Sequence, residues 1–423
     1  MIRLEAWVVE PLSKVANLTM GQSPDSRLYT SDESFFPFLQ GCAEFGRVNP
    51  VPVLFCRQEG KLGKLGKLDS ILFSVRAPVG KINIADRDYV IGRGLAAIEG
   101  VKIASTYLTQ YLHFVTPEFR AASQGSTFEA INSSALSAWP ISFPTSKAEQ
   151  TKIAEILSTV DQAIEQTEAL IAKQQRIKTG LMQDLLTRGI DAQGQLRTEQ
   201  THAFKDSPLG RIPVEWEVAR LGEIADISAG VTLGKSHEGP DTVELPYLRV
   251  ANVQDGYLDL SDMKSIRVPE NQLEKYMLKV GDVLMNEGGD FDKLGRGAVW
   301  RAQVPVCLHQ NHVFKVRPHS EKLASDFLAA VSASPYGKSF FMMASKQSTN
   351  LASINSTQLK AFPIPLPDYH EQIRIQTQFN RLAQVLNGSA AELKKQRALK
   401  AALMQDLLTG RKRVTDLLEP AAA

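Results

Sequence analysis

The chain has 423 residues, of which 43% are hydrophobic and 7% aromatic, so two or three globular domains with sizeable cores are expected. A net charge of +2 and three scattered cysteines argue against a polycation, a disulfide framework and a zinc cluster. No apolar run approaches the roughly 18 residues of a membrane span, and the first residues lack the layout of a signal peptide. We therefore expect a cytoplasmic protein that makes no membrane contact.

The first part of the chain, residues 1–145, is expected to form a mixed α/β domain. Residues 71–75 and 79–85 combine β-branched side chains with turn signals and predict strands. Residues 103–115 carry apolar side chains at helical spacing and predict a helix that ends before Pro117. The order of the strands in the sheet does not follow from these patterns.

A long helix is predicted over residues 146–190. At 1.5 Å per residue, about 40 helical residues would span roughly 60 Å. Its apolar residues recur at alternating steps of four and three, the heptad pattern of helices that pair through a narrow seam. Gln174 and Lys178 interrupt the seam, which indicates either a device that fixes the register or a stutter in the heptad count. The predicted seam residues are Ile153, Leu157, Val160, Ile164, Ile171, Leu181 and Leu185.

The second part of the chain repeats this order. Residues 191–212 are rich in Gly, Gln and Thr and predict a surface linker. Residues 213–367 predict a second mixed α/β domain, residues 368–411 a second seam helix, and residues 412–423 a tail. In the second helix, Gln396 and Lys400 interrupt the apolar pattern at matching places. The predicted seam residues are Ile375, Phe379, Leu382, Leu386, Leu393, Leu403 and Leu407.

Two sequence repeats mark the duplication. INSSALSAWPISFP at residues 131–144 returns as INSTQLKAFPIPLP at residues 354–367, and LMQDLLT ends both long helical stretches, at residues 181–187 and 403–409. The expected fold is two α/β (mixed α+β) domains separated by a long antiparallel two-helix coiled-coil spacer, with an internal pseudo-two-fold repeat. Such a molecule suits a target with two sites, and sites on one face of a DNA duplex recur at roughly 34–36 Å.

The sequence contains none of the common catalytic motifs. GxxxxGK[ST], GxSxG, HExxH and a GxGxxG after a strand are all missing, as is an adenine-methyltransferase tetrapeptide such as NPPY. His309 and His312 lie close together in sequence, but no second ligand pair supports a metal site. We therefore expect no catalytic residue, metal or cofactor in this chain.

The order of the segments resembles the specificity (S) subunits of type I restriction-modification systems. The resemblance covers essentially all 423 residues. It rests on the tandem arrangement, on FLQGCAEFGRVNP, SVRAPVGKINIADRDYVIGRGLAAI and YLRVANVQDGYLDLSDMKSI, on the FKDSPLGRIPVEWEV entry to the second half, and on the two LMQDLLT ends. It implies a non-catalytic subunit whose two target recognition domains each read one half of an asymmetric bipartite site in double-stranded DNA.

The same resemblance implies partners. The long helices are expected to set the spacing between half-sites and to dock two methyltransferase (M) subunits, which bring S-adenosylmethionine. Restriction (R) subunits, which use ATP and Mg, are expected to join the full complex. Two alternatives stay open: a non-catalytic coiled-coil adaptor, and the specificity component of a differently arranged methyltransferase-nuclease system.

Candidate DNA-contacting residues are polar side chains in turn-rich or glycine-rich stretches, since Arg reads guanine and Gln or Asn reads adenine through paired hydrogen bonds. The candidates in the first domain are Gln40, Arg47, Arg76, Lys81, Arg87 and Arg93. Those in the second are Arg249, Asn252, Asn286, Lys293, Arg296, Gln310 and Asn311. The polar residues Gln124, Ser126, Gln347, Ser348 and Asn350 precede the repeated INS segment, which is itself predicted to be a turn and helix cap.

Overall fold

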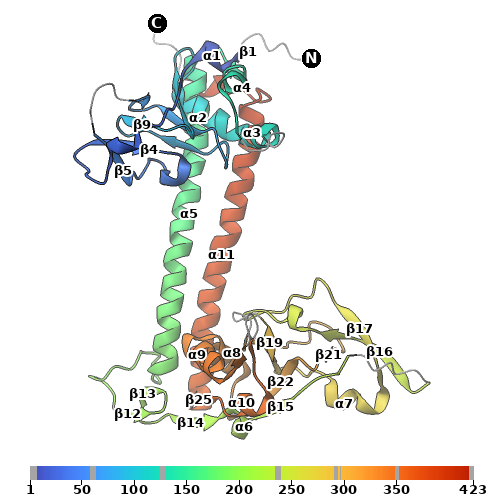
Figure 1. The fold of residues 1–423 in the computed structure, drawn as a ribbon. Coiled ribbons are helices and arrows are strands. Elements are labelled where there is room, and N and C mark those ends of the chain that lie inside the picture. Colours follow the sequence, from blue (N-terminus) through green and yellow to red (C-terminus); the bar gives the residue numbers. More distant parts are fainter. Residues whose placement is uncertain are drawn as a thin grey trace. The chain divides into compact units, whose positions relative to one another are not determined.

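The computed structural model describes residues 7–57, 63–123, 130–233, 240–289, 294–295, 297–347 and 352–418. The chain forms two compact units (Figure 1). Unit 1 comprises residues 1–169 and 390–423, and unit 2 comprises residues 170–389. Each unit therefore contains one globular body, the beginning of the long helix that follows it, and the end of the other long helix.

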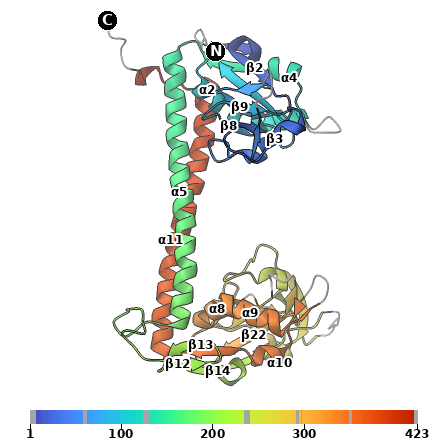
Figure 2. The same ribbon diagram turned by 60° about the vertical axis from the view of Figure 1, so that its left-hand side comes forward.

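Unit 1 contains a four-stranded and a five-stranded sheet together with short helices (Figure 2). Its strands and helices are β1 (Trp7–Pro11), α1 (Leu12–Val15), β2 (Ala16–Met20), β3 (Tyr29–Thr30), β4 (Phe36–Leu39), β5 (Leu54–Cys56), β6 (Leu65–Gly66), β7 (Ile71–Ser74), β8 (Ile82–Ile84), β9 (Tyr89–Ile91), β10 (Leu95–Gly100), α2 (Ser105–Phe114), α3 (Thr116–Ser123), α4 (Ser133–Ser137), β11 (Pro140–Pro144) and the start of α5 (Lys147–Thr187).

Unit 2 begins with the end of α5 and closes with the start of α11. Its other strands and helices are β12 (Phe204–Ser207), β13 (Gly210–Pro213), β14 (Glu217–Arg220), α6 (Leu221–Ile224), β15 (Ala225–Ser228), β16 (Thr242–Leu248), β17 (Lys264–Pro269), α7 (Leu273–Tyr276), β18 (Val283–Asn286), β19 (Gly288–Gly289), β20 (Gly297–Val299), β21 (Leu308–His309), β22 (Val313–Pro318), α8 (Ser325–Ala333), α9 (Pro335–Ala344), β23 (Lys346–Gln347), β24 (Ala352–Ser353), α10 (Ser356–Lys360), β25 (Pro363–Leu366) and α11 (Tyr369–Leu407).

The main sheets of the two units have the same strand order. The order is β2-β10-β7-β8 in unit 1 and β15-β22-β18-β20 in unit 2, and every neighbouring pair is antiparallel. Each unit also contains a parallel strand pair, β4 with β9 in unit 1 and β16 with β21 in unit 2. The strand register thus assigns each position at these sheet edges a counterpart in the other unit.

The repeated INS segments form the predicted helix caps. The Asn132 side chain accepts a hydrogen bond from the Ala135 backbone N–H at 2.8 Å, and the Asn355 side chain accepts one from Gln358 at 2.9 Å. Each cap satisfies a backbone donor that the first turn of a helix leaves open. The prediction of a turn and cap is confirmed for both copies.

Several boundaries differ from the sequence expectation. Pro117 lies in the first turn of α3, where its missing N–H is not needed, so a second helix follows directly after α2. Residues 204–213, expected within and just after a surface linker, form the β12–β13 hairpin. Gln124, Ser126, Ser348 and Asn350 lie outside the described residues.

Candidate nucleic-acid interface

Four of the six candidate residues of the first domain lie around one hollow in unit 1. Gln40, Arg76, Lys81 and Arg93 are all exposed and come from three separate connections: the one after β4, the β7–β8 turn and the β9–β10 turn. The remaining lining consists of small or short residues, among them Ser23, Gly41, Ala43 and Gly94, together with the half-buried Glu44. The hollow therefore presents three cations and one amide, which donate hydrogen bonds to phosphates and base edges, beside one carboxylate, which accepts them.

A buried serine shapes the β7–β8 turn, which carries Arg76 and Lys81. The Ser74 hydroxyl donates to the Pro78 carbonyl oxygen at 2.7 Å and accepts from the Lys81 backbone N–H at 2.9 Å. Ser74 is only 1% exposed, so both bonds are shielded from water. The turn is thus fixed from its inner side while its two cationic side chains stay exposed.

Close backbone contacts hold the other two connections together. The Gly92 N–H donates to the Leu39 carbonyl oxygen at 2.8 Å. A Cβ atom at Gly92 would lie 2.8 Å from the Gln40 carbonyl oxygen, and one at Gly21 would lie 2.1 Å from the Gly92 oxygen. Only glycine permits this approach, which sets Gln40 beside Arg93.

Arg47 and Arg87 do not line this hollow. Arg47 forms ion pairs with Glu165 at 3.0 Å and Glu168 at 3.6 Å, both on α5. The Arg87 guanidinium lies 5.9 Å from the centre of the Tyr89 ring. Both remain proposals as DNA contacts, but each has a protein partner.

The corresponding edge of unit 2 is built in the same way. The Gln310 N–H donates to the Leu248 carbonyl oxygen at 2.9 Å, as Gly92 does to Leu39. A Cβ atom at Gly230 would lie 1.9 Å from the His309 carbonyl oxygen, which is the steric counterpart of Gly21. Gln310 and Asn311 are therefore half-buried at the edge that in unit 1 carries Gly92 and Arg93.

Three other candidates of the second domain have structural contacts. The Arg249 guanidinium bonds Asp262 at 2.7 Å. Asn252 is 3% exposed and bonds the backbone of Arg249, Asp259 and Asp262. Asn286 is fully buried and donates to the Val253 carbonyl oxygen at 3.2 Å. Lys293 and Arg296 lie outside the described residues.

His309 and His312 do not form part of a metal site. Among the described residues, no group of three or more His, Cys, Asp or Glu side chains could hold a metal ion. His309 is fully buried, its Nδ1 lies 2.7 Å from the Val313 carbonyl oxygen, and burial lowers its pKa to about 4. His312 instead pairs with Glu287, at 2.5 Å between Nδ1 and Oε2. Glu287 was not among the residues predicted from the sequence, because its match with a position of unit 1 follows only from the strand registers of both sheets.

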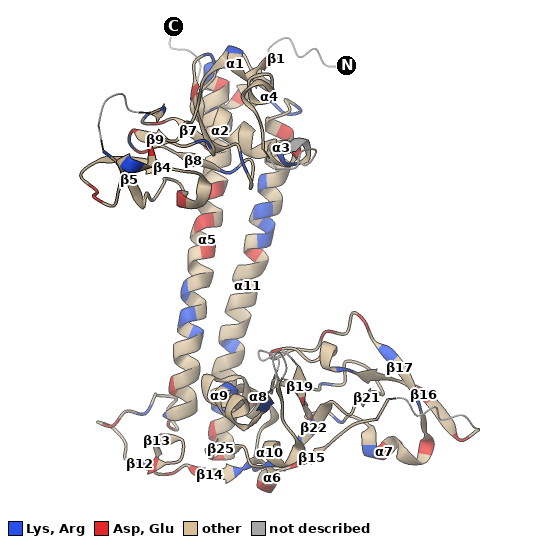
Figure 3. Ribbon diagram, viewed as in Figure 1, with Lys and Arg blue, Asp and Glu red and all other residues tan. Residues whose placement is uncertain are grey.

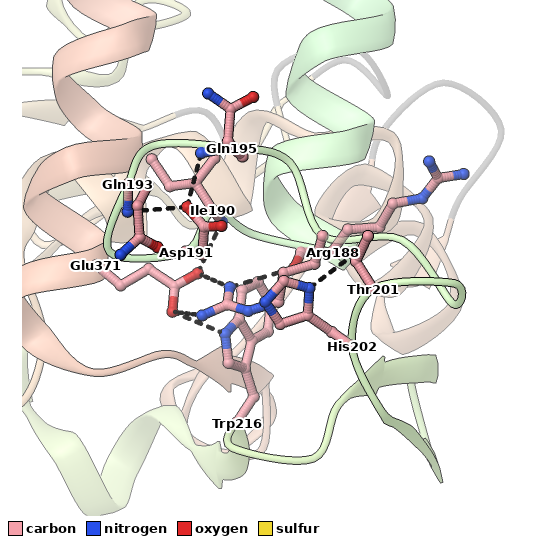
Figure 4. Close-up of polar contacts among 10 residues, drawn as sticks. Arg188, Ile190, Asp191, Gln193, Gln195, Thr201, His202, Trp216 and Glu371 are labelled. Atoms are coloured by element: carbon pink, nitrogen blue, oxygen red, sulfur yellow. Dashed lines mark hydrogen bonds and ion pairs between the residues drawn. The ribbon is translucent and has the colours of Figure 1, made fainter.

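The start of α11 carries a buried carboxylate that joins three segments of unit 2 (Figure 4). Glu371 is 3% exposed and accepts hydrogen bonds from the Ile190 backbone N–H at 2.9 Å and the Trp216 indole N–H at 3.2 Å. Both of its oxygens also pair with Arg197, at 3.1 Å for Nη2. Arg197 belongs to the expected linker, which is thereby fixed to the start of the helix.

Unit 1 has the same contact at the start of α5. Glu149 is fully buried and forms two hydrogen bonds of 2.6 Å with the Arg413 guanidinium, which follows the end of α11. This contact raises the Arg413 pKa above its ordinary value. We call the Glu149–Arg413 and Glu371–Arg197 pairs the two clasps. Neither clasp was predicted from the sequence, although each glutamate precedes a glutamine at the matching place of its repeat.

Ion pairs also connect α5 and α11 inside unit 1. Lys400 pairs with Asp161, and Arg397 pairs with Glu168 at 2.8 Å. In both pairs the basic residue belongs to α11 and the acidic residue to α5, two helices whose charged positions are coloured in Figure 3. Because residue numbers rise along one helix as they fall along the other, the two segments in this unit run in opposite directions.

Some of the predicted seam residues belong to or pack against the globular cores, and the others lie along the helices. Ile153, Leu157 and Leu407 lie in the core of unit 1, and Leu185 and Ile375 lie in the core of unit 2. Leu403 packs against the first core, and Leu181 and Phe379 pack against the second. The rest are half-buried or buried on the helices: Val160, Ile164, Ile171, Leu382, Leu386 and Leu393.

Comparison with known proteins identifies the family. The sequence model described as "Type I restriction modification DNA specificity domain" matches residues 64–174 and 213–397, which is more than half of the chain. The chain belongs to this family. The matched stretches include Arg76, Lys81 and Arg93 of the hollow in unit 1, whereas Gln40 precedes them, and they include the corresponding edge of unit 2.

Curated relatives of this specificity-domain family are named as specificity subunits. The chain is 37% identical over 187 residues to the putative type I restriction enzyme MjaX specificity subunit of Methanocaldococcus jannaschii, covering 43% of each protein. It is 29% identical over 279 residues to the MjaVIII specificity subunit of the same organism, covering 64% of this chain and 61% of that protein. The matches thus span less than two thirds of these relatives.

Solved structures share the fold of the whole chain. The type I restriction-modification S subunit from M. genitalium has a TM-score of 0.57 at 15% identity and covers 96% of this chain and 97% of its own. A second structure, described as the "structural basis underlying complex assembly and conformational transition of the type I R-M system", has a TM-score of 0.58 at 18% identity. It covers 95% of this chain and 97% of its own. In this specificity-domain chain, no helix of the described ranges is long and apolar enough to cross a bilayer.

Proposed function

We propose that this chain is the DNA sequence-recognition subunit of a type I restriction-modification complex and carries no catalytic group itself. The observation that supports this most strongly is the hollow of unit 1, where Gln40, Arg76, Lys81 and Arg93 converge at a sheet edge that recurs in unit 2. Because the chain belongs to a DNA specificity-domain family, two such edges suit a bipartite DNA site, with one edge for each half. The target recognition domains would comprise residues 1–145 and 213–367.

The helices would set the distance between the two half-sites. In this proposal residues 146–190 and 368–411 pair as an antiparallel coiled coil along their seams and relate the two halves by a pseudo-two-fold axis. The opposite chain directions of α5 and α11 within unit 1 support this arrangement. Since seam residues at both ends belong to globular cores, only the middle of each helix would act as spacer.

The partners follow from the proposed role. Two methyltransferase subunits would dock on the two repeats and supply S-adenosylmethionine, and restriction subunits would add ATP- and Mg-dependent cleavage in the cytoplasm. Specific protein–DNA complexes typically favour the cognate site by about 4–10 kcal/mol. A single bidentate base contact gives about 1–3 kcal/mol, so two recognition domains would reach this range more readily than one.

Replacing Arg76 and Arg93 by alanine tests the proposal. Genome-wide methylation would be mapped in cells whose only copy of the gene carries R76A/R93A. We expect one half of the methylated motif to relax or the methylated fraction to fall, while the other half stays unchanged. The control is R27A, because Arg27 is exposed and its partner is the neighbouring Asp25. An unchanged motif in R76A/R93A would remove these arginines from the interface.

A further inference from the structure

The two units present different chemistry at the same place in the fold. In unit 1 the Val75 N–H donates to the Gly94 carbonyl oxygen at 2.9 Å; in unit 2 the Glu287 N–H donates to the His312 oxygen at 3.0 Å. The strand registers agree, since Ser74 faces Leu95 and Asn286 faces Val313. Glu287 therefore corresponds to Val75 and His312 to Gly94.

The repeated INS segments give the same correspondence independently. The Ile131 N–H donates to the Val75 carbonyl oxygen at 2.9 Å, and the Ile354 N–H donates to the Glu287 oxygen at 2.8 Å. Ile131 and Ile354 open the two copies of the repeat. The backbone of Glu287 is thus held by a hydrogen bond on each side, at a position that the duplicated fold fixes.

Val75 is 3% exposed and belongs to the core of unit 1, so the surface placement of Glu287 is argued from its partner His312. Gly94 lines the hollow of unit 1, so a side chain at the corresponding position, His312, extends over the corresponding surface of unit 2. The His312 side chain is 56% exposed and that of Glu287 is 29% exposed. At the next position unit 1 has Arg76, whereas unit 2 has Gly288, where a Cβ atom would lie 2.7 Å from the Ala352 carbonyl oxygen. Unit 2 therefore has no room for a counterpart of Arg76.

On this basis, which rests on the proposed function, we infer that Glu287 is a specificity-determining residue of unit 2 and that His312 positions it. A carboxylate accepts hydrogen bonds, and among the base edges in the major groove it suits the cytosine N4 amino group. A carboxylate facing phosphates is repelled, so a base donor is its favourable partner on such a surface; the Glu44 carboxylate of unit 1 instead shares its hollow with Arg76, Lys81 and Arg93. Unit 1 would read with arginine donors, and unit 2 with an acceptor.

The preorganisation of Glu287 supports a reading role. Its backbone is bonded on both sides, and its Oε2 lies 2.5 Å from the His312 Nδ1, so one carboxylate oxygen is engaged and the other can accept from a base. Contacts held by a second side chain on a rigid sheet edge lose less freedom on binding. His312 would act through Glu287 and would not itself select a base.

The test is the methylated motif of cells in which the gene carries E287Q or H312Q. Glutamine keeps the size of Glu287 but removes its charge, so preference for the cytosine-containing base pair should fall by roughly 5- to 150-fold. That ratio would be measured as methylation of the cognate against the singly substituted site. H312Q should relax the same base pair to a smaller degree. E244Q is the matched control, because Glu244 is an exposed carboxylate of the same unit, paired with Arg267 at 3.4 Å.

The outcomes separate this inference from the proposed function. Relaxation of one base pair in one half-site by both variants, with the other half-site intact, supports it. An unchanged motif in E287Q overturns the role of Glu287, although the wild-type gene would still direct a bipartite motif. If E287Q abolishes methylation, its thermal unfolding decides: a wild-type Tm supports the inference and a lowered Tm overturns it. If no motif depends on the wild-type gene, the proposed function itself fails.

Discussion

The clasp of unit 1 gives the sharpest stability prediction. Replacing Arg413 by methionine leaves Glu149, which is fully buried, without the two 2.6 Å hydrogen bonds that it accepts from the Arg413 guanidinium. Breaking one side of a buried ion pair costs about 3–5 kcal/mol, because a buried charge stays uncompensated. The Arg413 side chain is 31% exposed, so water can reach the vacated position and the lower end of that range applies. We therefore expect R413M to destabilise unit 1 by about 3 kcal/mol.

A double-mutant cycle measures this contribution. Replacing both partners, as in E149M/R413M, removes the unpaired charge and should return the unfolding free energy to within about 1 kcal/mol of the wild-type value. Hydrogen exchange would assign the effect to a unit, since R413M should increase exchange in β1, β11 and the start of α5 but not in unit 2. An R413M variant within 1 kcal/mol of wild type, or a double variant less stable than R413M, would refute the reasoning.

Three further predictions concern unit 2 and the helices. Burial lowers the pKa of His309 from its ordinary 6.5 to about 4. The unfolded chain therefore binds this proton at a higher pH than the folded chain does, so the free energy of unfolding is highest above pH 6.5 and decreases as the pH falls toward 4. H309Q should therefore lose less stability than wild type between pH 7 and pH 5 in urea titrations; equal losses would contradict this. G230A should destabilise unit 2 by about 1–3 kcal/mol, since its Cβ would lie 1.9 Å from the His309 oxygen; an unchanged denaturation midpoint would refute the clash. G180A, with nothing within 4 Å, should instead raise stability by about 0.5–1 kcal/mol; a fall would show a contact there.

Features set by local sequence were predictable. Asn132 and Asn355 cap their helices because an asparagine side chain reaches the N–H groups of the next turn. The two long helices followed from the heptad spacing of their apolar residues. The strand order of the sheets was not predictable, because the parallel pairing of β4 with β9 depends on residues about 50 positions apart.

The candidate site was predictable only in part. Gln40, Arg76, Lys81 and Arg93 were chosen as polar residues in turns, and the fold brings them together around one hollow. The same rule also selected Asn286, which the fold buries completely. Polarity cannot separate a side chain that bonds its own backbone from one that stays available to a ligand.

Other important residues carried no local signal. Arg197 lies in a stretch whose composition indicates a linker, and its partner Glu371 is 174 residues away in sequence. Glu287 was missed because its significance depends on its match with Val75, which requires the register of both sheets. Long-range pairing, rather than residue type, decides such roles.

Mapping DNA methylation in cells with and without this gene tests the central claim most directly. The account predicts an adenine-methylated motif of two specified parts separated by unspecified base pairs, present with the gene and absent without it. Restoring the gene with R76A/R93A should then alter one part only. Methylation that is identical with and without the gene, while the accompanying methyltransferase is expressed, would contradict the account.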